Sequence, residues 1–207
     1  MTRKAKDMGE EKKEYSLLLL AGGKSSRMGQ DKAALSYEGI SFLENLLKKA
    51  ERAGIKEKYL SGHETSLKGI HCVPDNYKDR GPLGGMQACM KQMDTPYCLV
   101  LPVDVPQLPV QVMEGLITAH KKLRKEGGKE IPLLLSHGGR EEPLIGIYPT
   151  KMADMIEETI KEGAASVFSV LRKWGYGTCQ VEMEEWQGEN INTPQTYQEI
   201  LKHETGN

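Results

Sequence analysis

The chain has 207 residues, of which 38% are hydrophobic and 28% are charged, and its formal net charge is −1. This length suits one domain, and the apolar runs that recur along the chain exclude a largely disordered protein. A net charge near zero provides no basic field that would attract nucleic acid. The four cysteines lie far apart and form no Cys-x-x-Cys pair, which is typical of reduced cytoplasmic thiols rather than of a disulfide framework or a zinc site.

The first fourteen residues are charged and contain no apolar stretch. We therefore predict a flexible tail over residues 1–14, which is no signal peptide, followed by a single domain over residues 15–207. The longest early apolar run, residues 17–21, is far too short to span a bilayer. We expect a cytoplasmic protein without a membrane segment.

Strand and helix patterns alternate along the rest of the chain. The apolar run at 15–21 predicts a central strand that is buried on both faces, and apolar positions in helical spacing predict a helix over 41–53 that Ser41 caps and Gly54 ends. Thr193 is the expected N-cap of the last helix. Further strands are expected at 58–61, 69–73, 97–101, 131–136, 144–148 and 178–183, and further helices after the loop at 81, then at 110–125, 151–161, 165–174 and 194–202. This alternation predicts an α/β fold, with a mostly parallel sheet and helices on both of its faces.

The segment LLLLAGGKSSRMGQDKAAL, residues 17–35, carries the most informative motif. An apolar strand ends there in Ala21-Gly22-Gly23, and Arg27 and Lys32 follow within ten residues. Glycines allow the backbone to approach a ligand closely, and successive NH groups form a concave anion site. The motif therefore predicts a polyphosphate site, where arginine grips two oxygens and lysine acts as a point charge.

Two common phosphate motifs do not fit this segment. A Walker A loop requires glycine where the chain has Leu18, and the dinucleotide fingerprint that starts at Gly22 requires glycine where the chain has Lys24 and Arg27. The loop belongs to a different kind of phosphate site.

Two aspartates directly follow predicted strands. Ligands of open α/β sheets lie beyond the carboxyl ends of the strands. Asp104 follows the strand at 97–101, where a lone carboxylate suits Mg²⁺ whose shell is completed by substrate phosphates. Asp75 follows the strand at 69–73 and can accept hydrogen bonds from N1–H and the 2-amino group of guanine, a pair that adenine does not offer. The alternative for both residues is a turn-forming aspartate beside proline.

The pattern L-A-G-G-x-S-x-R-M-G-x-D-K at residues 20–32 resembles the signature loop of the nucleotidyltransferases, and within them of the molybdenum cofactor guanylyltransferases (MobA-like). The segments at 75–86, 104, 143–148 and 190–194 resemble further family motifs in the same order. Two departures stand out: Gly84 replaces the usual alanine, which removes only a methyl group, and the family's asparagine after the second strand falls on Ser61 or Gly62. The Ser61 hydroxyl or the backbone would have to substitute for that asparagine.

The resemblance implies a single Rossmann-like nucleotidyltransferase domain and assigns roles to residues of the matching motifs. Arg27, Lys32 and Asp104 would be catalytic, with Asp104 as the metal ligand. Asn190 and Asn192 point the same way on an extended segment, and they would grip an acceptor phosphate or pterin or complete the metal shell. The alternative is that Asn192 or Thr193 only caps the last helix. The residues implied in binding the nucleotide and its partner are Leu20, Ala21, Gly22, Gly23, Lys32, Asp75, Gly81, Asp104, Asn190 and Asn192.

The implied activity is the Mg²⁺-dependent transfer of GMP from GTP to the terminal phosphate of molybdopterin, with release of pyrophosphate. The expected partners are GTP, molybdopterin and, transiently, cofactor-insertion proteins, and the expected state is a monomer or a weak oligomer. Two alternatives remain open. One is another nucleotidyltransferase, which uses CTP on the same pterin or GTP on a sugar phosphate, and the other is a non-catalytic GTP-binding module that delivers the cofactor.

Overall fold

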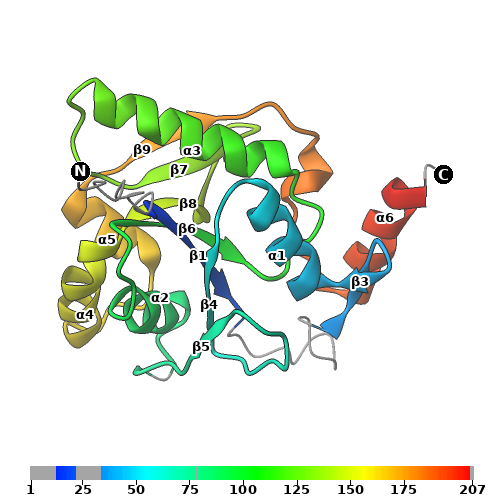
Figure 1. Ribbon diagram of the computed structural model, residues 1–207, viewed down its shortest axis with the longest axis horizontal. Coiled ribbons are helices and arrows are strands. Elements are labelled where there is room, and N and C mark those ends of the chain that lie inside the picture. Colours follow the sequence, from blue (N-terminus) through cyan, green and yellow to red (C-terminus); the bar gives the residue numbers. More distant parts are fainter. Residues whose placement is uncertain (1–12, 22–33, 78, 206–207) are drawn as a thin grey trace, which may run out of the picture.

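Parallel pairing around one central strand organises the sheet (Figure 1). The computed structural model describes residues 13–21, 34–77 and 79–205. Strand β1 (Tyr15–Leu20) pairs in parallel with β4 (Glu57–Ser61) on one side and with β6 (Tyr97–Pro102) on the other. All six residues of β1 are buried, as expected for a strand that is covered on both faces.

The sheet has seven strands in the order β5-β4-β1-β6-β8-β7-β9. At one edge β5 (His71–Val73) runs parallel to β4, and at the other β9 (Gly177–Gln180) runs parallel to β7 (Leu133–His137). Strand β8 (Arg140–Pro149) is antiparallel to both β6 and β7. The tight link to β7 explains this direction, because Gly138 and Gly139 have φ of 54° and 76°, and a two-residue turn of this kind joins antiparallel strands.

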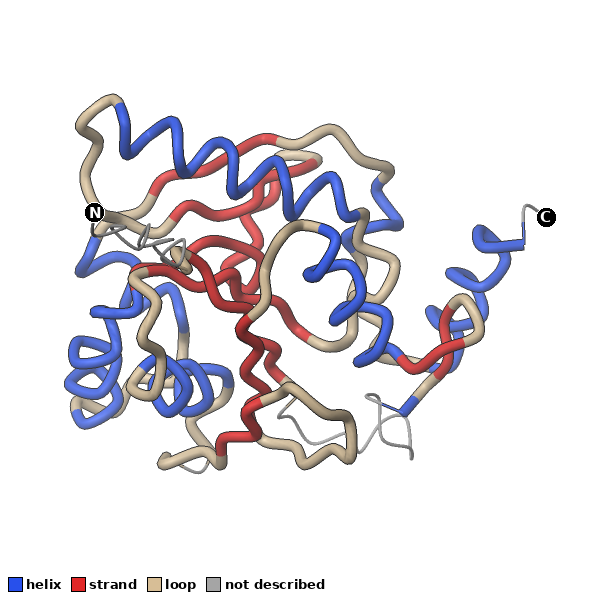
Figure 2. The backbone as a smooth tube through the Cα atoms, in the orientation of Figure 1, coloured by secondary structure: helices blue, strands red, loops and turns tan. Residues whose placement is uncertain are grey.

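Helices cover both faces of the sheet, which confirms the predicted α/β architecture (Figure 2). Alternate side chains of β1 point to opposite faces, so Leu17 and Leu19 belong to one core and Leu18 and Leu20 to the other. The first core is covered by α1 (Phe42–Arg52) and α3 (Val110–Lys125), and the second by α2 (Pro82–Met90), α4 (Ala153–Lys161) and α5 (Val167–Trp174).

A small third core lies beside α1, at the right of Figure 1. There the last helix, α6 (Pro194–Thr205), packs against a hairpin formed by β2 (Ser36–Tyr37) and β3 (Ile40–Ser41). The Tyr197 hydroxyl donates a hydrogen bond of 2.6 Å to the carbonyl of Ser36. The sequence did not predict this hairpin, because two-residue strands are too short to show a period of two.

The predicted N-caps of two helices are confirmed. The Ser41 hydroxyl accepts from the backbone NH of Glu44 at 3.1 Å, and the Thr193 hydroxyl accepts from that of Thr196 at 3.1 Å. Some boundaries differ from the predictions. The expected helix at 151–161 begins with a short 3-10 turn over Thr150–Met152, the strand at 178–183 ends at Gln180, and α6 extends to Thr205.

The predicted tail lies mostly outside the described residues. Of its residues only Lys13 and Glu14 are described; Lys13 forms an ion pair with Glu57, and Glu14 forms one with Arg124 at 3.0 Å. All four cysteines are free thiols. Within the described ranges, no helix is long and apolar enough to cross a membrane.

Candidate active site

The carboxyl ends of four strands form one row across the sheet. A single register row contains residues from β5, β4, β1 and β6, namely Val73, Ser61, Leu20 and Pro102. Asp75 follows two residues after this row, as do Gly22 and Asp104 on their own strands. Chain connections diverge on the two sides of β1, which is the place where open α/β sheets bind ligands.

Part of the predicted site lies outside the described residues, namely Gly22, Gly23, Arg27 and Lys32. Their predicted roles stay predictions. Leu20 and Ala21 lead into this loop. Leu20 is buried, and the backbone NH of Ala21 donates to the carbonyl of Ser61 at 3.2 Å, so Ala21 lies beside the end of β4.

The Ser61 side chain holds the Asp75 carboxylate. Ser61 is only 1% exposed, and its hydroxyl donates a hydrogen bond of 2.6 Å to Oδ1 of Asp75. Of the two residues left open for the family's asparagine, Ser61 is therefore the one whose side chain faces the base-reading candidate. Asp75 itself is half-buried, so one carboxylate is fixed by a buried donor while it remains accessible to a ligand.

Two helical glycines allow the Asp75 segment to lie directly on α2. A Cβ on Gly85 would come within 1.9 Å of Oγ of Ser61 and 3.2 Å of Oδ1 of Asp75. A Cβ on Gly84 would come within 2.6 Å of the carbonyl oxygen of Tyr77. The expectation that Gly84 is a mild departure from alanine is therefore wrong for this backbone, because a methyl group there would collide with main chain rather than fill empty space.

Gly81 begins the helix that carries these glycines. It is exposed, it stands at the N-cap of α2, and its φ of 56° lies in the left-handed region that favours glycine. Pro82 takes the first helical position, as predicted. Gly81 thus turns the chain from the Asp75 segment into α2.

The thiol of Cys89 on α2, which interacts electrostatically with Asp75, is uncharged. Burial raises the pKa of Cys89 to about 12, and the charge of Asp75 adds to this rise. The thiol therefore stays protonated at neutral pH and leaves Asp75 without a second anion from this position.

Asp104 lies on a loop that the sheet and the core both fix. The backbone NH of Val103 extends the ladder by donating to the carbonyl of Leu20 at 3.0 Å. Val103 and Val105 are buried on either side of Asp104, which is half-buried. Asp104 is the one residue between 97 and 108 that is half-buried rather than buried, so its carboxylate can reach a ligand.

The late Asn-Ile-Asn segment lies beside Asp104. The backbone NH of Ile191 donates to the carbonyl of Asp104 at 2.8 Å. Ile191 is fully buried in the third core, whereas Asn190 and Asn192 are exposed. The two asparagines therefore share the outward side of an extended segment, as the sequence predicts, and Thr193 provides the side-chain cap of α6 that is described above.

Two residues that the sequence did not single out fasten this region. The side-chain amide of Gln107 donates to the carbonyls of Trp186 at 3.3 Å and of Glu189, which ties the Asp104 loop to the segment that precedes Asn190. Lys49 of α1 donates to the carbonyl of Pro106, and burial lowers its pKa to about 8. A single glutamine or lysine between apolar residues has no pattern that would reveal such a contact.

The described residues suit Mg²⁺ better than a metal ion whose ligands all come from the protein. Within those residues no group of three or more His, Cys, Asp or Glu side chains is placed to hold a metal ion. Mg²⁺ is commonly bound through one or two carboxylates, with substrate phosphates and water as the remaining ligands. A half-buried Asp104 that follows the end of a strand fits this type of site.

Comparison with known proteins identifies the family. A family model described as a MobA-like NTP transferase domain matches residues 17–176, which include β1, the Asp75 segment and Asp104. The chain belongs to this family. As a MobA-like NTP transferase it is a nucleotidyltransferase, and its relatives connect it with molybdenum cofactor biosynthesis.

Relatives of this MobA-like transferase, and solved structures that resemble it, agree with this assignment. A molybdenum cofactor guanylyltransferase from Pseudomonas aeruginosa (strain LESB58) is 30% identical over 185 residues, which cover 87% of this chain and 91% of the relative. The structure of molybdopterin-guanine dinucleotide biosynthesis protein A from Archaeoglobus fulgidus superposes with a TM-score of 0.74 at 22% identity, covering 93% of this chain and 100% of that one. A CMP:2-keto-3-deoxy-manno-octonic acid synthetase complexed with CTP superposes with a TM-score of 0.70 at 12% identity, covering 93% and 99%. These two structural likenesses concern the fold alone.

The contact between Gly84 and Tyr77 yields a stability prediction. Gly84→Ala should lower the free energy of unfolding by about 1–3 kcal/mol, because the new methyl group overlaps a backbone carbonyl at 2.6 Å. Gly115→Ala in α3 is the matched control, since its Cβ would meet only the side chain of Val181 at 3.6 Å, and alanine should raise stability there by about 0.5–1 kcal/mol. Urea unfolding of both variants tests this; a Gly84→Ala protein as stable as Gly115→Ala would contradict the close contact.

Proposed function

We propose that this nucleotidyltransferase transfers GMP from GTP to the terminal phosphate of molybdopterin and releases pyrophosphate. The observation that carries the proposal is the Asp75 carboxylate, which a buried Ser61 hydroxyl holds at 2.6 Å at the same edge of the sheet as Asp104. The relative from Pseudomonas aeruginosa, a molybdenum cofactor guanylyltransferase, supports the same reaction.

Asp75 is the proposed reader of the guanine base. Its carboxylate would accept hydrogen bonds from N1–H and the 2-amino group. An ionised carboxylate has about four lone-pair sites, so the Ser61 bond leaves enough acceptors for both donors. A base without this pair of donors would leave a half-buried carboxylate poorly satisfied, which is the physical basis of strong discrimination.

The phosphates of GTP are proposed to lie at the signature loop. The backbone of Gly22 and Gly23 would approach them closely, Arg27 would grip two oxygens, and Lys32 would supply a compact positive charge. Asp104 would hold Mg²⁺, which when bound neutralises negative charge on the triphosphate and on the leaving pyrophosphate.

The acceptor side is proposed to involve Asn190 and Asn192, which lie beside Asp104 and face outward. An oxygen of the acceptor phosphate attacks the α-phosphorus of GTP, and the bond to the β-phosphate breaks. The acceptor is already an oxyanion and needs no base, so the protein contributes positioning and charge neutralisation rather than a covalent intermediate. Transient docking to cofactor-insertion proteins would pass the product on.

Nucleotide preference is the first test. GTP should exceed ATP and CTP by roughly 10³-fold in kcat/KM, because only guanine satisfies Asp75. Pyrophosphate release is measured with each nucleotide, with and without molybdopterin, for the wild type and Asp75→Ala, and the exposed Asp94→Ala serves as a control for folding. A preference for CTP would favour a cytidylyltransferase, transfer to a sugar phosphate but not to molybdopterin would favour a different acceptor, and GTP binding without pyrophosphate release would favour a delivery module.

The second test concerns the metal. Asp104→Ala should abolish Mg²⁺-dependent turnover while leaving the thermal unfolding temperature close to that of the wild type, because Val103 and Val105 rather than Asp104 fill the core at this loop. Turnover and unfolding are measured on the same preparation. Near-normal turnover would mean that Asp104 is only a turn residue.

The third test separates binding from chemistry at Lys32. Lys32→Ala should lower kcat/KM by about 10- to 150-fold, as expected for the loss of a charge-assisted contact worth roughly 1.5–3 kcal/mol. We expect kcat to fall as well as KM to rise, because the charge lies near the reacting phosphates. Lys24→Ala, at a variable position of the motif, is the control and should have a much smaller effect. An unchanged kcat/KM for Lys32→Ala would refute the proposed phosphate loop.

A further inference from the structure

The segment that carries Asp75 is fastened by three consecutive side chains. Asp75, Asn76 and Tyr77 connect β5 to the start of α2 and belong to no helix or strand. The partner of Asp75 is Ser61 on β4, that of Asn76 is Gln87 on α2, and that of Tyr77 is Glu157 on α4. Three separate elements thus hold the position of one carboxylate.

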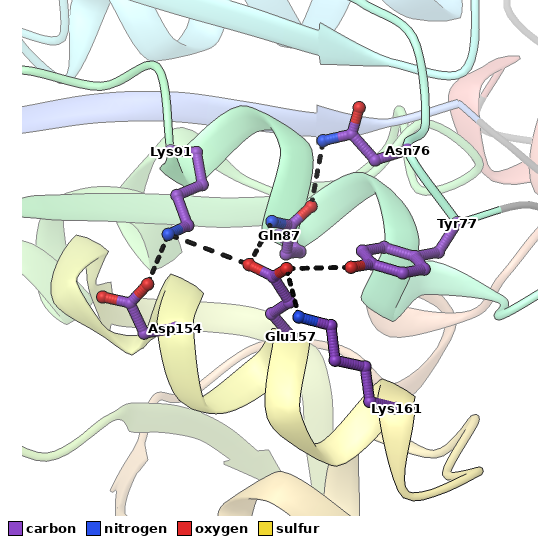
Figure 3. A network of polar contacts seen from close by, with 7 residues as sticks. All are labelled: Asn76, Tyr77, Gln87, Lys91, Asp154, Glu157 and Lys161. Atoms are coloured by element: carbon purple, nitrogen blue, oxygen red, sulfur yellow. Dashed lines mark hydrogen bonds and ion pairs between the residues drawn. The ribbon is translucent and has the colours of Figure 1, made fainter.

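Gln87 links two of these contacts through its buried amide (Figure 3). It is 3% exposed, and both ends of the amide are used. Its oxygen accepts from the Asn76 amide at 3.1 Å, and its nitrogen donates to Oε2 of Glu157 at 3.3 Å. The amide of Asn76 is therefore connected to α4 through one buried side chain.

Glu157 is the acceptor that the donors of this network share. Its Oε1 accepts from the Tyr77 hydroxyl at 2.9 Å and from the Lys161 ammonium at 2.8 Å, and Lys91 lies 3.8 Å from Oε2. The bonds from Lys161 and Tyr77 lower the pKa of the Glu157 carboxyl, and the bond to Glu157 raises the pKa of the Tyr77 hydroxyl. At neutral pH the pair is thus an ionised acceptor and a protonated donor, as the contact requires.

Packing of α4 on α2 does not by itself need this arrangement. Asp154, one turn earlier on α4, already forms an ion pair with Lys91, the C-cap residue of α2. Glu157 differs from Asp154 because its donors include Tyr77 and Gln87, and so it reaches the Asp75 segment as well as the helix (Figure 3).

We propose that Glu157 is a positioning residue for base selection: through Tyr77 and Gln87 it fixes the segment that presents Asp75 to the nucleotide base. The proposal rests on the proposed role of Asp75 in reading guanine. It adds a determinant of selectivity that lies on α4, outside the signature loop and the strand ends.

Loss of Glu157 should therefore affect recognition of the base and leave the chemical step nearly unchanged. Without it, the Tyr77 hydroxyl and the Gln87 amide lose their common acceptor, while Ser61 still donates to Asp75. The carboxylate remains but is less well aligned with the two donors of guanine. The phosphates, which the signature loop would bind, are not affected.

The experiment measures dissociation constants for GTP and ITP by titration calorimetry on the full chain, in the absence of acceptor. ITP has N1–H and lacks the 2-amino group, so the ratio of the two constants reports the second hydrogen bond to Asp75. Glu157→Ala and Tyr77→Phe should weaken GTP binding by about 3- to 10-fold, the size of one neutral hydrogen bond, and should lower the preference for GTP over ITP. Asp154→Ala, which removes the other α4 contact to Lys91, is the matched control and should leave the preference unchanged.

The outcomes separate this inference from the proposed function. If Asp75→Ala lowers the preference for GTP over ITP while Glu157→Ala and Tyr77→Phe do not, the positioning role is wrong and the base-reading role stands. If Asp75→Ala also leaves the preference unchanged, the base-reading role fails and the inference fails with it. Adding Glu157→Ala to Asp75→Ala should cause no further loss of preference, because the effect passes through Asp75; a further loss of equal size would overturn the inference. Tyr77→Phe removes a single hydroxyl, so it keeps the test valid if Glu157→Ala folds poorly.

Discussion

The in-register parallel pairing of β1 with its two neighbours is the constraint on which the site depends. It aligns Val73, Ser61, Leu20 and Pro102 in one row, so that the segments which follow leave the sheet at the same edge. The register itself is specified by burial, because alternate leucines of β1 fill two different cores, and a slip by one residue would exchange them. The position of the site thus follows from how the core is packed.

The two sides of the site are stabilised in different ways. Beside β6, main-chain and side-chain groups act together: Val103 bonds to Leu20 and Ile191 to Asp104 through the main chain, while the side chains of Gln107 and Lys49 donate to neighbouring carbonyls. Beside β5, side chains dominate, since Ser61, Gln87 and Glu157 each hold one residue of the Asp75 segment. Main-chain contacts persist when side chains change, whereas side-chain contacts change with single substitutions. The position of Asp75 is therefore open to change by single substitutions at these three side chains.

This difference agrees with what the fold does and does not specify. A CMP:2-keto-3-deoxy-manno-octonic acid synthetase shares the architecture with a TM-score of 0.70 at only 12% identity, and a fold by itself does not specify a substrate. Under the proposed function, the choice of base would lie in the side chains at the strand ends and in the residues that support them. In this chain those supports include Gly84 and Gly85, which leave room for the Asp75 segment to lie on α2.

The sequence by itself determined the α/β class, most helices and strands, and the caps at Ser41 and Thr193, because these depend on short-range patterns. It also determined the outward pair Asn190 and Asn192 and the family, because these depend on contiguous motifs. Roles assigned to residues 22–32 rest on the sequence alone. Only the tertiary structure decided the direction of β8, the β2/β3 hairpin, the need for glycine at 84, and the partners of Asp75 and Tyr77. Tyr77 and Glu157 lie 80 residues apart in the chain, and their contact exists because α4 docks beside α2. Such a contact is set by the packing of whole elements, and no local spacing of residue types encodes it.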